Sequence, residues 1–193
     1  MKRYVLAVTG ASGAVFGIRL LEELLKSVEV HLVISTNTFP IIKAETGIDW
    51  ANDTETCIRK HFGTDRLFFH EDRDMEAPVA SGSFRTDGML VVPCTMKTLA
   101  GIANGYANNL IERAADVTIK EGRPLLLSPR EMPFSAIHLE NMLKLAKLGV
   151  CIAPPVPAFY HQPRDINGII EFVVGKILDS FGIEHDLFKR WKD

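Results

Sequence analysis

The chain has little cysteine. Only three of its 193 residues are cysteines, Cys57, Cys94 and Cys151, and they form neither a CxxC pair nor an even set. This argues against a disulfide-stapled fold and against a cysteine-based zinc site. Isolated thiols are typical of a reducing compartment, and we expect each one to be a small buried hydrophobic residue.

An excess of charge of one sign is also missing. The 22 Lys and Arg residues nearly balance 24 Asp and Glu residues, the formal net charge is -2, and basic residues do not form runs. Proteins that bind nucleic acid usually carry a basic patch or stripe. We therefore expect no nucleic acid as a partner.

Long apolar runs are absent too. No stretch approaches the roughly 18 apolar residues of a membrane-spanning helix, so no membrane association is expected. A basic start followed by an apolar run resembles a signal peptide, but Gly10, Gly13, Gly17 and Arg19 interrupt that run too early. We expect a soluble cytoplasmic protein.

Common catalytic signatures are lacking as well. The six histidines show no metal-ligand spacing, and the chain contains neither HExxH nor the GxSxG turn of serine hydrolases. We therefore expect no metal ion and no Ser/His/Asp hydrolase.

What the sequence does contain is an alternation of short apolar strands with helices. Strands are predicted at Tyr4–Thr9, Val30–Ser35, Gly88–Cys94, Pro124–Ser128 and Val150–Ala153. Helices are predicted from Phe16 to about Ser27 and at Thr38–Thr46, Asp53–Phe62, Thr95–Ala103, Leu110–Lys120, Ser135–Leu148 and Asp165–Phe181.

Fully apolar strands that alternate with helices indicate a parallel sheet covered on both faces. We predict an α/β fold, a single doubly wound, Rossmann- or flavodoxin-like parallel sheet, in one domain over residues 1–193 with a tail at 182–193. The stretch Gly63–Arg85 has weak periodicity and is expected to be irregular. Ligands of such folds bind at the carboxyl ends of the strands.

The loop after the first predicted strand is built from small residues, Gly10-Ala11-Ser12-Gly13. Such a loop lets backbone N–H groups at a helix N-terminus approach a phosphate. Its spacing departs from GxGxxG, and Ser35 stands where a dinucleotide enzyme carries Asp or Glu for the ribose. This disfavours NAD, whereas a hydroxyl suits the ribityl chain or phosphate of FMN.

A second candidate anion site is the helix start Pro93-Cys94-Thr95-Met96-Lys97-Thr98. It offers two hydroxyls, a lysine and exposed N–H groups. The alternative is an ordinary helix cap with a solvated lysine.

Arg113 and Lys120 lie seven residues apart on one predicted helix, about 10 Å along its axis and on one face. They could bracket a phosphate, including one that belongs to a neighbouring subunit. Surface salt bridges with Glu112, Asp116 and Glu121 are the plain alternative.

Arg130 and Glu131 lie between Pro129 and Pro133 at the end of an apolar strand. A carboxyl group held there can exchange protons with a ligand while the arginine holds an anion; a structural ion pair is the alternative. The proline-rich loop of residues 154–161 presents aromatic groups. Its His161 is either a base or, more commonly for a lone histidine, structural.

Several motifs occur together in a fixed order. They are GASGA (Gly10–Ala14), SGSF (Ser81–Phe84), PCTMKTLAGIANGY (Pro93–Tyr106), ERAADV (Glu112–Val117), PREMP (Pro129–Pro133), HLENM (His138–Met142) and PPVPAFYH (Pro154–His161). In this set the chain resembles the UbiX-type flavin prenyltransferases along nearly its whole length. Prenyl transfer comes from this resemblance and not from the residue patterns above.

The resemblance implies a site for FMN and a site for dimethylallyl phosphate. FMN would be held by Gly10, Ala11, Ser12, Ser35, Thr95, Met96, Lys97, Thr98 and Arg130. The donor phosphate would meet Arg113 and Lys120 of an adjacent subunit together with Tyr160 and Lys176. Some members of the family carry arginine where Lys176 stands. The catalytic candidates are Glu131, Ser12 and Glu45, and Trp191 would be a further pocket group.

The family chemistry joins N5 of reduced FMN to C1 of the prenyl group, releases phosphate and then joins flavin C6 to prenyl C3. The resemblance further implies prenylated FMN as a cofactor for a UbiD-type decarboxylase, including in ubiquinone biosynthesis, and a trimer-based homododecamer without metal. Two other functions remain open. One is flavin-dependent cysteine decarboxylation, which needs a catalytic histidine and a PASANT-type loop where this chain has PCTMKT; the other is non-catalytic flavin carriage. Decarboxylation of aromatic acids by the chain itself is disfavoured, because only the flavin could stabilise a carbanion.

Overall fold

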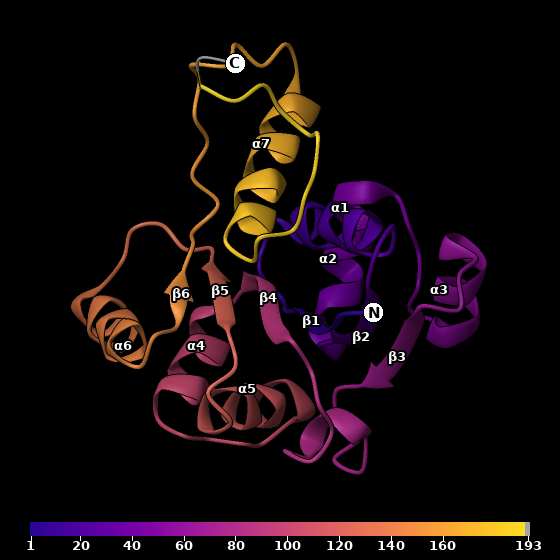
Figure 1. Cartoon of the computed structure of the whole chain (residues 1–193), viewed down its shortest axis with the longest axis vertical. Coiled ribbons are helices and arrows are strands. Elements are labelled where there is room, and N and C mark those ends of the chain that lie inside the picture. Colours follow the sequence, from indigo (N-terminus) through magenta and orange to yellow (C-terminus); the bar gives the residue numbers. More distant parts are fainter. Residues whose placement is uncertain (192–193) are drawn as a thin grey trace.

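The computed structural model describes residues 1–191 and is built around one parallel β-sheet (Figure 1). Its strands are β1 (Arg3–Val8), β2 (Glu29–Ile34), β3 (Leu67–Glu71), β4 (Gly88–Cys94), β5 (Leu125–Pro129) and β6 (Cys151–Ile152). They are ordered β3-β2-β1-β4-β5-β6, and every pairing is parallel. The predicted doubly wound α/β fold is confirmed.

Within residues 1–191, seven helices connect and cover the strands. They are α1 (Ala14–Leu24), α2 (Phe39–Thr46), α3 (Thr54–Phe62), α4 (Met96–Ala103), α5 (Leu110–Lys120), α6 (Ala136–Lys147) and α7 (Ile166–Asp179), with short 3-10 turns at Thr36–Thr38 and Pro78–Ala80. None of the described helices has the length and apolar character needed to cross a membrane.

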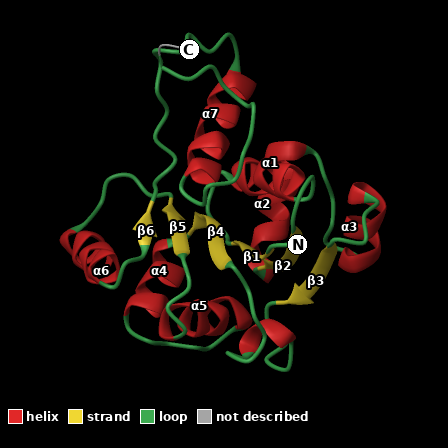
Figure 2. Cartoon of the chain, viewed as in Figure 1, coloured by secondary structure: helices red, strands yellow, loops and turns green. Residues whose placement is uncertain are grey.

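The helices form two layers, one on each face of the sheet (Figure 2). Alternate residues of β1 point to opposite faces, so Tyr4, Leu6 and Val8 pack with α1, α2, α3 and α7, while Val5 and Ala7 pack with α4, α5 and α6. Burial on both faces explains why the central strands are continuously apolar.

The prediction that residues 63–85 are irregular was wrong for their first part, because Leu67–Glu71 forms β3. This strand pairs only with β2 and lies at the edge of the sheet. Leu67 is buried but Phe68 is 39% exposed, so the segment lacks the continuous apolar character that identified the other strands. An edge strand does not need that character, because part of its surface faces solvent.

The cysteines require a second correction. Cys94 is buried, but Cys57 is only partly buried and Cys151, on the two-residue edge strand β6, is exposed. The expectation that all three thiols are buried was therefore wrong, and the predicted strand Val150–Ala153 is shorter than expected.

Close packing of α1 on β4 positions the first loop. A Cβ atom at Gly17 would lie 2.3 Å from the carbonyl oxygen of Val92, so no larger residue fits there without displacing the helix. The predicted caps are confirmed at two other helices, where the Thr95 and Ser135 side chains accept hydrogen bonds from the backbone N–H groups of Thr98 and His138.

Candidate active site

The crevice between the loops after β1 and β4 is the topological switch point of the sheet. β1 and β4 are neighbours, but α1 covers one face and α4 the other, so the two loops diverge from each other. Ligands of doubly wound folds bind in such a crevice. The structure thereby places the predicted loop Gly10–Gly13 beside the predicted corner Thr95–Thr98.

Thr9 joins these two loops, and the sequence analysis did not single it out. Its buried hydroxyl donates to the carbonyl oxygen of Pro93 and accepts from the backbone N–H of Thr95, both at 2.8 Å. A hydroxyl with both its donor and acceptor partners holds the relative position of two backbones. A threonine that ends an apolar strand just before a glycine loop is the one signal that could have identified it.

The N-terminus of α1 already has a carboxylate on it. Gly13 N–H donates to the two carboxylate oxygens of Glu45 at 2.9 and 3.1 Å, and Val15 N–H donates at 3.3 Å. The helix dipole favours a negative group at this place. The structure thus brings Glu45, a predicted catalytic residue, to the first loop.

At the other side of the crevice, α4 begins with its polar groups available. The hydroxyls of Thr95 and Thr98 bond to each other at 2.9 Å, and Met96 is half-buried beside them. Lys97 is exposed, and its ammonium has no partner within residues 1–191. The helix N-terminus and this cation together suit an anion.

Three further predicted groups at the carboxyl ends of the strands are unengaged. The side chains of Ser12, Ser35 and Arg130 make no hydrogen bond or ion pair in the described part of the chain. The backbone of Arg130 is tied to the crevice, since its N–H donates to the carbonyl oxygen of Cys94 at 3.2 Å.

The alternative considered above, a structural ion pair between Arg130 and Glu131, is not formed. Glu131 instead accepts a hydrogen bond of 3.0 Å from the backbone N–H of Met132. Both residues line a cavity of about 380 Å³ between the segments 129–134 and 154–157. Its wall is mainly proline and other apolar side chains, so it offers an apolar surface beside the crevice.

An aromatic cluster lies beyond this cavity, around α7. The rings of Tyr160 and Trp191 meet edge-to-face with centroids 5.1 Å apart, and Tyr160 also contacts Phe172 at 5.8 Å. His161 stacks on Phe172 at 4.8 Å, and both of its ring nitrogens are buried without a hydrogen bond. This arrangement favours the structural interpretation of His161.

Lys176 lies on α7 with its ammonium 3.4 Å from Asp179, and its side chain is 56% exposed. The structure therefore groups three of the residues that are predicted to bind the prenyl donor. These are Tyr160, Lys176 and Trp191, on α7 and the segments beside it. The tail predicted at 182–193 is described as far as Trp191; its last two residues lie outside the described part.

Arg113 and Lys120 lie elsewhere, on α5, which covers the face of the sheet opposite to α7 (Figure 1). Arg113 donates to the carbonyl oxygen of Ala80 at 3.0 Å and pairs with Asp116 at 2.8 Å, and Lys120 pairs with Glu121 at 2.7 Å. The salt bridges with Asp116 and Glu121 considered above are thus present. Within one chain, these two cations do not join the other site residues.

Phe84, in the SGSF motif, lies with this second group. Arg123 donates to the carbonyl oxygens of Gly82 and Phe84 at 2.7 and 2.9 Å, so α5 and the turn that follows it hold the segment 80–84. The ring of Phe84 lies under the guanidinium of Arg3 at 4.5 Å.

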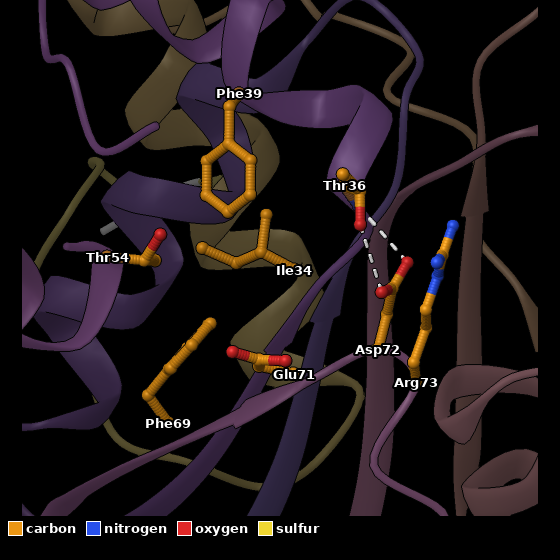
Figure 3. Close-up of a pocket in the computed structure, with 8 residues that line it drawn as sticks. All are labelled: Ile34, Thr36, Phe39, Thr54, Phe69, Glu71, Asp72 and Arg73. Carbon is orange, nitrogen blue, oxygen red and sulfur yellow. Dashed lines mark hydrogen bonds between the residues drawn. The ribbon is translucent and has the colours of Figure 1, made fainter. Parts of the chain in front are cut away.

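A second cavity, of about 330 Å³, lies at the carboxyl ends of β2 and β3 (Figure 3). Ile34, Phe39 and Phe69 form its apolar side, and Thr36 donates to the Asp72 carboxylate from its N–H and its hydroxyl at 3.1 and 3.0 Å. No predicted site residue lines it, although Thr36 directly follows Ser35.

Burial determines the reactivity of the thiol closest to the crevice. Cys94 is fully buried, which raises the pKa of its thiol well above the usual range. It is therefore inert as a nucleophile. Among residues 1–191, no group of three or more His, Cys, Asp or Glu side chains is arranged to hold a metal ion.

Known proteins are similar to this chain over nearly its full length. A family model described as "Flavoprotein" matches residues 1–178. The flavin prenyltransferase UbiX of Methanocaldococcus jannaschii is 51% identical over 189 residues, which cover 98% of each chain.

Two solved structures are also similar to this chain over nearly its full length. The chain named AnUbiX (PadA1), in complex with FMN and dimethylallyl pyrophosphate, is 46% identical and superposes with a TM-score of 0.91 over 100% of this chain and 98% of its own. A dodecameric FMN-dependent UbiX-like decarboxylase from Escherichia coli O157:H7 is 48% identical, with a TM-score of 0.90 over 99% and 100% of the two chains. The FMN-dependent cysteine decarboxylase SpaF is 17% identical with a TM-score of 0.59 over 80% of this chain and 84% of its own, so it shares the fold alone.

Proposed function

The chain belongs to the flavoprotein family and to its UbiX-type flavin prenyltransferases, and from this premise we propose that it joins the prenyl group of dimethylallyl phosphate to reduced FMN. One observation carries the proposal. Two helix N-termini, joined through Thr9, face a crevice whose candidate ligands Ser12, Ser35, Lys97 and Arg130 have side chains without partners in the described part of the chain.

The chemistry of these four side chains fits FMN. Hydroxyls at Ser12 and Ser35 suit a ribityl chain, and the cations of Lys97 and Arg130 suit a phosphate. The N-termini of α1 and α4 add backbone N–H groups and positive dipole ends, with Gly10 and Ala11 allowing close approach. A chain that is 46% identical and was solved with FMN and dimethylallyl pyrophosphate supports this assignment.

The prenyl donor occupies the apolar cavity and the aromatic cluster beyond it. The rings of Tyr160 and Trp191 stabilise positive charge on the allylic group, and Lys176 binds the phosphate. Arg113 and Lys120 complete the phosphate site from a neighbouring subunit. Their place on α5, on the face opposite α7, supports a site shared between chains, because their own chain does not bring them to Tyr160.

Bound reduced FMN supplies N5 as the nucleophile that bonds to prenyl C1 while phosphate leaves, and C6 for the bond to prenyl C3 that closes the ring. The chain supplies the rest. Lys176, Lys120 and Arg113 neutralise the leaving phosphate, so no metal ion is needed. Glu131 moves the proton that ring closure releases, and Ser12 and Glu45 orient the reacting groups at the first loop.

A shared site requires a neighbouring subunit, and the oligomer that we propose is a homododecamer built from trimers. A 48% identical chain described as dodecameric supports it. So do exposed apolar side chains on α6, where Leu139 and Leu143, one turn apart, are 53% and 57% exposed. The product, prenylated FMN, would then pass to a UbiD-type decarboxylase, including in ubiquinone biosynthesis.

Flavin-dependent cysteine decarboxylation is the second candidate function. The likeness to the 17% identical decarboxylase SpaF extends to the fold alone. His31, which lies within β2, is bonded to Glu29 and His70 and is not available as a catalytic base at the crevice. The prenyltransferase assignment is therefore the better supported.

Anaerobic incubation of the protein with reduced FMN and dimethylallyl phosphate, followed by mass spectrometry of the extracted flavin, tests the proposal. We expect the flavin to gain one five-carbon prenyl unit, and Glu131→Ala to lose this product while still binding FMN. Asp49→Asn is the control, because Asp49 is exposed and bonds to the exposed Lys43 and to the backbone N–H of Ala51, away from the predicted site. Unmodified FMN from folded, flavin-loaded wild-type protein would contradict prenyl transfer and leave flavin carriage.

A further inference from the structure

The residues after α7 turn back and run along that helix as a strap, here defined as residues 183–191 (Figure 1). The strap packs closely at Gly175, where a Cβ atom would lie 2.5 Å from the Phe188 ring and 2.7 Å from the His185 ring. Phe188 also contacts Phe172, with ring centroids 5.0 Å apart. The strap is therefore seated on α7 at a place where only glycine fits.

One carboxylate anchors the strap. Asp179, at the end of α7, receives both terminal nitrogens of Arg190, at 2.9 and 3.2 Å, and Nε2 of His185 at 3.2 Å. Lys176 approaches the same carboxylate at 3.4 Å. The hydrogen bonds from Arg190 are the largest cause that holds the pKa of Asp179 below its usual range, so the carboxylate is ionised at neutral pH. Fork-to-fork contact of this kind fixes orientation as well as distance.

The anchor determines where Trp191 lies. Trp191 directly follows Arg190, and its ring meets Tyr160 edge-to-face at 5.1 Å. Tyr160 belongs to the proline-rich loop that precedes α7, whereas Trp191 follows α7. The two hydrogen bonds from Arg190 to Asp179 fix the chain directly before Trp191, in addition to the apolar contacts that Phe188 makes with α7.

We propose that Asp179 is a positioning residue for the prenyl donor: through Arg190 it holds Trp191 against Tyr160, and through Lys176 it orients the ammonium that meets the donor phosphate. This inference rests on the proposed function, because it concerns the same donor site. Asp179 contacts neither substrate. Its effect is carried by the strap and by Lys176, which together close one side of the aromatic cluster.

The variants Asp179→Asn and Arg190→Gln test the inference, alone and combined. We expect each to raise KM for dimethylallyl phosphate about tenfold while kcat and the Kd of FMN stay within about twofold. Because Arg190 acts through Asp179, the double variant should be no worse than Asp179→Asn alone. Asp49→Asn, in the exposed pair with Lys43, is the matched control and should change nothing.

Cleavage by trypsin measures the release of the strap independently of prenyl transfer. Release of the strap should speed cleavage after Lys189 in Asp179→Asn, measured by mass spectrometry, with the midpoint of thermal unfolding within a few degrees of wild type. Faster cleavage with an unchanged KM would overturn the inference, as would a raised KM with unchanged cleavage. Loss of FMN binding together with global destabilisation would overturn it too, since Asp179 would then be merely structural.

Failure of the proposed function has a different signature. If the wild type forms no prenylated flavin, the transferase assignment fails. The role of Asp179 is then tested by whether dimethylallyl phosphate protects the strap from trypsin. Dimethylallyl phosphate should slow cleavage after Lys189 in the FMN-loaded wild type and not in Asp179→Asn. Equal protection, or none in either protein, would overturn the role of Asp179.

Discussion

The carboxylate of Glu45 lies against the backbone N–H of Gly13, which donates to its two oxygens at 2.9 and 3.1 Å. Gly13 precedes α1 with φ of 99°, a conformation that favours glycine, and its N–H points to the carboxylate rather than into the helix. A side chain from α2 thus stabilises the loop that we assign to FMN. We also predict a catalytic role for the same carboxylate.

Replacing Glu45 with glutamine separates these two roles. Glu45→Gln removes the negative charge from the N-terminus of α1, so the flavin-free protein should lose about 0.5–1 kcal/mol of unfolding free energy. Urea unfolding measures this loss, and Glu140→Gln, an exposed carboxylate without a partner in residues 1–191, is the control. Prenyl transfer should fall at least tenfold with FMN still bound. Wild-type turnover in Glu45→Gln would remove Glu45 from the catalytic group.

Thr9→Val should weaken both the fold and the flavin site. The change keeps the shape of the side chain but deletes a hydroxyl with two buried hydrogen bonds, which costs about 1–3 kcal/mol. Since it also frees the Thr95 corner from the first loop, the Kd of FMN should rise about tenfold or more, measured by calorimetry.

Thr118→Val is the matched control for this change. Thr118 is equally buried, and its hydroxyl donates to the carbonyl oxygen of Ala114 within α5 at 2.7 Å. We expect it to destabilise the protein without changing FMN affinity. If both variants bind FMN equally well, Thr9 does not organise the site.

Gly17→Ala should destabilise the protein, although alanine is the better helix former. The new methyl group would meet the Val92 carbonyl oxygen at 2.3 Å and push α1 away from β4. Overpacking of this kind costs about 1–3 kcal/mol. Gly168→Ala, in the first turn of α7, meets no atom closer than Cβ of Pro163 at 3.1 Å and should be close to neutral. Equal unfolding free energies for the two variants would contradict the close approach.

A histidine pair under the β2–β3 edge predicts a loss of stability in acid. His31 Nδ1 lies 2.8 Å from His70 Nε2, and burial together with the neighbouring imidazole lowers the pKa of His70 to about 4. The ordinary pKa of histidine is about 6.5, so between these values the unfolded chain binds more protons than the folded one. The stabilisation is complete above about pH 6.5 and is lost as the pH falls towards 4.

The groups around the pair are Glu29 and Arg3 beside His31, and Asp74 and Glu55 near His70. Urea unfolding at pH 7 and pH 5 should show a fall in unfolding free energy that is smaller in His70→Gln by about 1 kcal/mol. The same pH dependence in both proteins would show that the pair titrates normally.

The sheet could be predicted largely from the pattern of apolar residues. The errors in that prediction concern strands at the edges of the sheet. β1, β2, β4 and β5 are buried on both faces, so their apolar runs are continuous and their prediction is confirmed. β3 and β6 lie at the edges, where one residue in two has no need to be apolar, so one was missed and the other was drawn too long.

The site was predictable only where it depends on local sequence. The Thr95 cap follows from a threonine before a helix, and it is confirmed. The link from Thr9 to Thr95 spans 86 positions, and the anchor of Arg190 on Asp179 depends on how the strap folds back. Neither leaves a pattern in the sequence, because each is set by tertiary packing. The functional roles of the named residues stay predictions.

The most direct test of prenyl transfer in a site shared between chains is subunit complementation. Glu131→Ala and Lys120→Ala carry different tags and are co-expressed, and mixed oligomers are isolated through both tags. Each variant alone should form no prenylated FMN, whereas the mixed oligomer should regain about a quarter of wild-type activity, since about that fraction of sites pairs an intact Glu131 with an intact Lys120 of a neighbour. Mixed oligomers that stay inactive beside an active wild type would contradict the account.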